Sequence, residues 1–148
     1  MSISLFLRRL FGYDAALSDF EMFILDSVRN KHTDDIAILW DKQIQAINKI
    51  QRLQRGGEVN FYSMKKGRPH HDIELAFPNK TEELLVAKVQ LAVSNSKLIA
   101  NVWCVRGFVF SIEYEGHADS FEEAYGEEWA SEFVVNVKLL TDLSAKIE

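Results

Sequence analysis

The spacing of apolar residues changes from a helical period to a strand period near residue 57. Before this point apolar side chains recur every three or four residues, which is the period of one face of an α-helix. After it apolar and polar positions alternate over most of the chain, as they do in half-buried β-strands. The pattern predicts one α+β domain over residues 1–148, with residues 1–56 helical and residues 57–148 mainly antiparallel strands.

Three amphipathic segments account for the helical part. Residues 3–11 place apolar side chains on one side of a helix and two arginines on the other. A second helix is expected to begin at Ser18, because Ser18 and Glu21 have the spacing of a capping box. A third is expected to begin at Thr33 and to continue to Gly56-Gly57, where the glycines end it.

Short turns separate the strand segments, and short connections join antiparallel neighbours. The six expected strands are Glu58–Met64, Asp72–Phe77, Leu84–Val93, Leu98–Val105, Phe108–Glu115 and Phe133–Thr141. A second capping box at Ser120 predicts a short helix within residues 120–132. The expected architecture is two to three N-terminal helices packed on one face of a curved, mostly antiparallel six-stranded meander sheet.

The central hairpins predict two chemically different sheet faces. A two-residue turn at Arg106-Gly107 places Trp103 opposite Phe110, and alternation then separates an aliphatic side from an aromatic, partly polar side. The aliphatic side consists of Leu85, Ala87, Val89, Leu91, Val93, Leu98, Ala100, Val102, Cys104 and Val109. If the helices cover it, the other side is a candidate ligand or partner surface, formed by Lys88, Gln90, Asn101, Trp103, Phe110 and Tyr114. The alternative is that sheet curvature folds the aromatic side into the main core.

The net charge of −5 on 148 residues is unevenly distributed. Residues 1–70 carry 11 Lys and Arg against 8 Asp and Glu, whereas residues 71–148 carry 6 against 14. An acidic half attracts a basic protein partner, although acidic loops also keep a domain soluble. A second candidate surface is the acidic loop of Glu122, Glu123, Glu127, Glu128 and Trp129. Its alternative is a solvated helix whose tryptophan packs on the sheet.

No motif in the chain indicates catalysis. The sequence contains no Gly-rich phosphate loop, dinucleotide fingerprint or nucleophile elbow, so no catalytic residue and no cofactor is assigned. Cys104 lies among apolar residues and is expected to be a buried, inert thiol, and a single cysteine fits the cytoplasm.

Two short rows of polar residues have the composition of metal or proton-transfer sites. Histidines and carboxylates gather within residues 70–74, and a similar row spans residues 113–119. Neither has helical metal-ligand spacing. A solvated turn and a half-exposed strand end are the favoured interpretations, and no metal is assigned.

Two further partner classes are disfavoured. The basic run at residues 65–71 lacks interleaved aromatic residues, so no nucleic acid is expected. No stretch is long and apolar enough for a transmembrane segment. Residues 3–11 are expected to dock on the core or close on a partner, and peripheral contact with a membrane is the weaker alternative.

These patterns favour a non-enzymatic protein-interaction domain that binds a protein partner through acidic loops, the aromatic sheet face, or both. Small acidic bacterial-type adaptor, inhibitor or immunity-like domains have a comparable composition, which is an analogy of composition alone. The alternative is a small-molecule-binding or enzymatic α+β domain with a pocket between the sheet and the helices.

Overall fold

The structure is a computed structural model that describes residues 13–53, 56–126 and 132–146. Its helices are α2 (Asp19–Arg29), α3 (Asp34–Ala46) and α4 (Ala118–Tyr125), with a short 3-10 helix, η2 (Ile73–Leu75). Its strands are β1 (Tyr13–Asp14), β2 (Lys49–Leu53), β3 (Glu58–Tyr62), β4 (Met64–Lys65), β5 (Arg68–Pro69), β6 (Glu83–Val93), β7 (Ser96–Val105), β8 (Phe108–Glu115) and β9 (Val134–Leu139). The helix expected at residues 3–11 lies outside the described residues.

The main sheet has the strand order β1-β2-β3-β8-β7-β6-β9, and every neighbouring pair is antiparallel. Because β1 has only two residues, six strands of five residues or more make up the sheet in the described chain. The predicted α+β class with N-terminal helices is confirmed. β6, β7 and β8 form the expected meander, whereas β3 joins it at β8 and β9 returns to β6.

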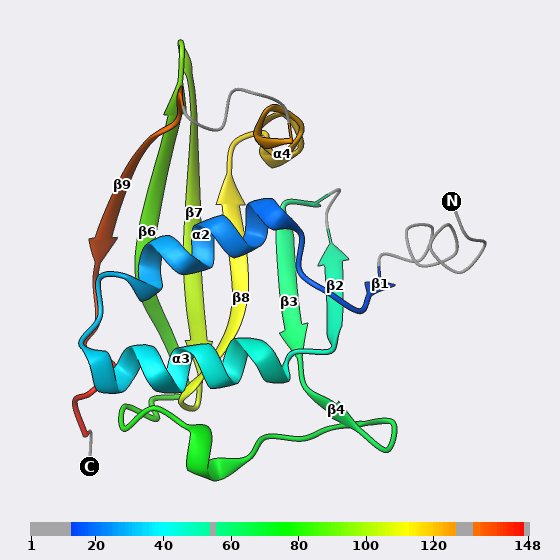
Figure 1. The fold of residues 1–148 in the computed structure, drawn as a ribbon, viewed down its shortest axis with the longest axis vertical. Helices are drawn as coiled ribbons and strands as arrows, with labels where there is room; N and C mark the ends of the chain where they lie inside the picture. Colours follow the sequence, from blue (N-terminus) through cyan, green and yellow to red (C-terminus); the bar gives the residue numbers. More distant parts are fainter. Residues whose placement is uncertain (1–12, 54–55, 127–131, 147–148) are drawn as a thin grey trace.

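Helices α2 and α3 cross the same face of the sheet (Figure 1). The core beneath them contains most of the predicted aliphatic side: Ala87, Val89, Leu91, Leu98, Ala100, Val102, Cys104 and Val109, all buried. The prediction that Leu85 lies on the aliphatic side is wrong, because a bulge between Leu85 and Ala87 pairs Leu85 with Trp103 on the opposite face. The helices therefore cover the aliphatic side, and the meander presents its other side away from them.

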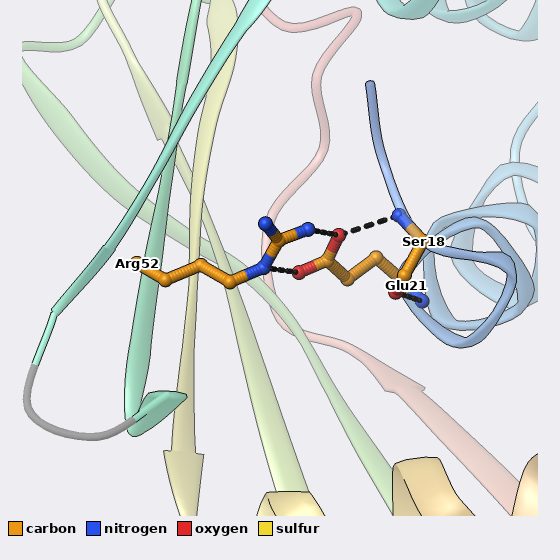
Figure 2. A network of polar contacts seen from close by, with 3 residues as sticks. All are labelled: Ser18, Glu21 and Arg52. Carbon is orange, nitrogen blue, oxygen red and sulfur yellow. Dashed lines mark hydrogen bonds and ion pairs between the residues drawn. The ribbon is translucent and has the colours of Figure 1, made fainter. Parts of the chain in front are cut away.

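Helix α2 begins with the predicted capping box, which also anchors the helix to the sheet (Figure 2). The Ser18 hydroxyl accepts from the Glu21 amide at 3.1 Å, and the Ser18 amide donates to Glu21 Oε1 at 2.7 Å. The same carboxylate accepts two bonds from the Arg52 guanidinium of β2, at 2.7 and 3.1 Å. Glu21 is only 2% exposed. One buried carboxylate thus caps α2 and fixes the position of the helix over the edge of the sheet.

The predicted helix through Gly56-Gly57 is wrong in its second half. Helix α3 ends at Ala46, and residues 49–53 form β2. The spacing of the preceding isoleucines fits a helix, but Ile50 is fully buried and pairs with Phe61 across the β2–β3 hairpin. Gly56, with φ +84°, lies in the connection between these strands and does not end a helix.

The strand expected at Asp72–Phe77 is also wrong, because this segment contains η2. The Asp72 carboxylate accepts from the Glu74 amide at 3.1 Å, a local bond that competes with an extended backbone. Phe77 is fully buried, and its amide donates to the Gly107 carbonyl at 2.8 Å. The segment therefore crosses the end of the sheet as an anchored loop.

Replacing Glu21 by Gln tests the link between α2 and β2. The variant keeps the shape of the side chain but leaves the Arg52 guanidinium without its buried anion. We expect the free energy of unfolding to fall by about 2–3 kcal/mol in urea unfolding followed by circular dichroism.

The matched control is Glu82→Gln, which breaks an ion pair with Arg106 whose side chains are both largely exposed. Such a pair contributes little in water, so this variant should unfold like the unmodified protein. Equal losses of stability in the two variants would contradict the structural role of Glu21.

Candidate functional site

The sheet face opposite α2 and α3 is not covered by any helix of the described chain (Figure 1). Its central side chains alternate with the buried ones along each strand. We call this surface the open face: Glu58, Asn60 and Tyr62 of β3, Phe110, Ser111 and Glu113 of β8, Asn101 and Trp103 of β7, and Lys88 and Gln90 of β6. It is the candidate functional site.

Two cross-strand rows organise the open face. In the first, Asn60 pairs with Ser111, which pairs with Trp103. In the second, Glu58 pairs with Glu113, which pairs with Asn101, and Asn101 pairs with Lys88. Side chains paired in this way lie about 5 Å apart at their Cβ atoms and therefore interact directly.

Five of the six predicted surface residues lie on the open face, and Tyr114 does not. A bulge in β8 shifts the pairing after Trp103, so that Trp103 pairs with Ser111 and Tyr114 pairs with Ala100 on the helix side. There the Tyr114 ring stacks on Phe20 of α2 at 6.3 Å. Burial is the largest of the influences that raise the pKa of Tyr114 well above its ordinary value. Placing Tyr114 on the candidate surface was therefore wrong.

A shallow hollow of about 200 Å³ lies on the open face. Its lining is Glu58, Glu83, Trp103, Val105, Phe110, Ser111 and Glu113. The Tyr62 ring meets Phe110 edge-on at 5.7 Å and extends the aromatic surface. Among the described residues, no hydrogen bond or ion pair reaches the three lining carboxylates. Glu58 and Glu113 are direct cross-strand neighbours, so their like charges repel.

The adjacent part of the open face has its charges neutralised internally. Lys88 Nζ donates to Asn101 Oδ1 at 3.0 Å, Asn101 Nδ2 donates to Glu115 at 3.0 Å, and Lys88 lies 3.4 Å from the same carboxylate. The Asn101 hydrogen bond and the Lys88 charge lower the pKa of Glu115. On the described part of the open face, the carboxylates without such partners are those that line the hollow, Glu58, Glu83 and Glu113.

Asn60 lies beside the hollow and is only 8% exposed, yet its Oδ1 atom accepts no hydrogen bond. A buried carbonyl oxygen without a donor costs stability. Its neighbour Ser111 is also buried. Within the described part of the chain, Asn60 Oδ1 is therefore a buried acceptor that makes no hydrogen bond.

The described part of the predicted acidic loop lies on the helix-covered side of the sheet, away from the open face. Glu122 and Glu123 are exposed on α4, which begins at Ala118, before the capping box expected at Ser120. The Tyr125 ring of α4 packs on Phe20 and Phe23 of α2, so the helix belongs to the helix-covered side. Glu127, Glu128 and Trp129 lie outside the described residues.

The other candidate groups are placed as follows. Cys104 is fully buried in the core, and burial raises the pKa of its thiol far above the ordinary range. His71 stacks on Phe108 with ring centroids 4.4 Å apart, and burial together with neighbouring His70 lowers its pKa. No group of three His, Cys, Asp or Glu side chains within the described ranges is arranged to hold a metal ion.

Sequence patterns missed Glu58, Glu83, Asn60 and Ser111 as parts of the site. The polar alternation of β3 was visible, but its pairing with β8 was not, because the two strands are distant in the chain. Glu113 was visible as part of an acidic row whose partners were unknown. The signal that finds these residues is the tertiary pairing itself.

Comparisons of the chain with protein-family models, with curated proteins and with solved structures found no match. None of the helices in the described ranges has the length and hydrophobicity needed to cross a bilayer.

The unused acceptor of Asn60 predicts an unusual response to mutation. Asn60→Leu removes a buried oxygen that has no donor, so we expect the free energy of unfolding to stay the same or rise by up to about 1 kcal/mol. Asn101→Leu, on the same face and equally buried, removes an amide with both its bonds made. That variant should lose about 1–2 kcal/mol in the same urea titration. A larger loss for Asn60→Leu than for Asn101→Leu would contradict the assignment of a free acceptor.

Proposed function

We propose that this chain is a non-enzymatic interaction domain that binds a basic segment of a partner protein on the open face. The observation that carries the proposal is the pairing of Glu58 with Glu113 beside Trp103 and Phe110, with no ion pair to either carboxylate among the described residues. A partner that supplies the cation relieves the repulsion and gains the attraction.

Arginine is the partner side chain whose chemistry suits the hollow best. A guanidinium has five donors and no acceptor, and the carboxylates of Glu58, Glu83 and Glu113 are acceptors only. Its flat surface also stacks on aromatic rings, which the hollow offers in Trp103 and Phe110.

The size of the open face fits a protein partner. Strands lie about 4.8 Å apart and rise about 3.3 Å per residue, so the open face together with the same side of the flanking strands β2 and β9 gives a surface roughly 25 Å on each side. That area approaches the ~800 Å² that each partner contributes to a standard protein interface. An aromatic centre with a charged margin is also the usual composition of residues that dominate binding energy.

The acidic loop is the competing surface for the same kind of partner. Its described carboxylates, Glu122 and Glu123, are exposed on α4, at the helix-covered side of the sheet. They lack the paired arrangement and the aromatic hollow of the open face. We place the principal contact on the open face for this reason. We propose the cytoplasm as the setting, in keeping with a free, buried cysteine.

Charge reversal on the two surfaces distinguishes them. The double variants Glu58→Lys/Glu113→Lys and Glu122→Lys/Glu123→Lys change the net charge equally. A short arginine-rich peptide should bind the unmodified protein with a dissociation constant on the order of 0.1–1 mM and shift the Trp103 indole NMR signal. The first double variant should weaken binding by about tenfold or more, and the second by less than about threefold.

Two controls accompany this titration. The same peptide with glutamate in place of arginine should not bind, and added salt should weaken the arginine peptide's binding because the contact is exposed. Equal losses in both double variants would show attraction by net charge alone and would contradict a site on the open face. A greater loss in the α4 variant would transfer the site to the acidic loop.

A further inference from the structure

A second hollow lies at the end of the sheet on the helix side, between α3 and the loop that joins β3 to β6. That loop runs alongside α3 at the lower edge of the molecule (Figure 1). The hollow has a volume of about 250 Å³. One wall is apolar and is formed by Ala46, Ile47, Phe61, Leu75, Phe108 and Val109. An apolar cavity of about 150 Å³ is already large enough for benzene, so this one has room for a substituted ring.

Buried hydrogen bonds fix the shape of this cavity. Gln43 of α3 is only 6% exposed, and its Nε2 donates to the carbonyls of Leu75 at 2.6 Å and Gly107 at 2.9 Å. Its Oε1 accepts from the Val109 amide at 2.9 Å. One side chain thus joins the helix, the loop and the β7–β8 hairpin. Because these bonds within the chain hold the walls of the cavity in place, the entropic cost of binding is lowered.

The start of the loop is also anchored, because Asn48, which follows α3, bonds to Met64 of the β4–β5 hairpin. Asn48 Nδ2 donates to the Met64 carbonyl at 2.9 Å, and Asn48 Oδ1 accepts from the Met64 amide at 2.7 Å. The His70 amide donates to the Ser63 carbonyl at 2.7 Å. These bonds hold the two histidines of the loop at the rim, where the His71 ring stacks on Phe108.

The polar groups of the rim are mainly donors. The Ser63 hydroxyl and the imidazoles of His70 and His71 line the cavity, and each has an N–H or O–H to offer. Asp72 is the one carboxylate in the lining, and its Oδ1 already accepts from the Glu74 amide. The loop, residues 63–82, carries four cationic side chains, Lys65, Lys66, Arg68 and Lys80, against three carboxylates, Asp72, Glu74 and Glu82. The potential at the rim therefore favours an acceptor of negative charge.

We propose that this cavity binds a small carboxylate with a single aromatic ring, with the ring against the apolar wall and the carboxylate at Ser63, His70 and His71. The site does not rest on the proposed function, because it lies on the helix side of the sheet and shares no lining residue with the open-face hollow. The cavity lies between the sheet and a helix, and none of the six residues of the predicted ligand or partner surface lines it.

Three probes with the same ring separate the contributions of ring and head group: phenylacetate, phenylacetamide and phenethylamine. Titrated into the full chain, phenylacetate should shift the NMR signals of the His70 and His71 rings with a dissociation constant on the order of 1 mM. Phenylacetamide should bind about threefold to tenfold more weakly, and phenethylamine more weakly still. Tighter binding of the amine would overturn the assignment of a carboxylate.

Two matched pairs of variants locate the site. Ala46→Leu fills the cavity, whereas Gln45→Leu adds the same side chain at an exposed position next to it. His71→Gln removes a rim imidazole, whereas His117→Gln removes an exposed one at the start of α4. We expect phenylacetate binding to be lost in Ala46→Leu, to weaken about threefold to tenfold in His71→Gln, and to persist in both controls.

A folding control and two contradicting outcomes complete the test of this cavity. Ala46→Leu must keep the NMR spectrum of a folded protein, and His71→Gln, at the partly exposed rim, provides the test that does not depend on repacking. Absence of histidine shifts with every probe would overturn the proposal. Unchanged affinity for phenylacetate in both Ala46→Leu and His71→Gln would do the same.

Discussion

Burial of the aliphatic sheet face beneath α2 and α3 is the interaction on which the other features of the molecule depend. The face is built from small and branched residues such as Ala100 and Val102, which allow helices to approach closely. Glu21 fixes α2 over this face by joining its first turn to Arg52 of β2, and Gln43 fixes α3 by joining it to the β7–β8 hairpin. Because both helices lie on one side, the opposite side of the sheet is left to the solvent or to a partner.

The bulge in β8 decides which residues belong to which side. Without it, strict alternation would place Phe110 and Tyr114 together. With it, Tyr114 packs against α2, while Phe110 stays beside Trp103 and the paired carboxylates. One extra residue thus sends one aromatic ring to the core and keeps the other on the open face. Bulges commonly redirect side chains in this way at functional surfaces.

Local chemistry was predictable from the sequence, and long-range pairing was not. The capping box at Ser18 and the aliphatic face were found because each depends on residues close together in the chain. The prediction that the third helix continues to residue 55 was wrong. The isoleucine spacing alone suits a helix, but Ile50 lies in β2, where it is buried and pairs with Phe61 of β3. The placement of Trp103, Asn101 and Lys88 on one face was also predictable, because short turns join β6, β7 and β8 and fix their pairing. Glu58 and Asn60 were missed, since their importance arises from a strand far along the chain.

Hydroxyl-radical footprinting of the full chain, with and without the arginine-rich peptide, tests the central claim most directly. Trp40 of α3 is fully buried in the core on the helix side, and Trp103 lies on the open face, so these two tryptophans report on the two sides of the sheet. We expect Trp103 to be oxidised readily in the free protein and protected by the peptide, and Trp40 to be protected in both states. Protection of Trp103 that does not change when the peptide binds would contradict a partner site on the open face.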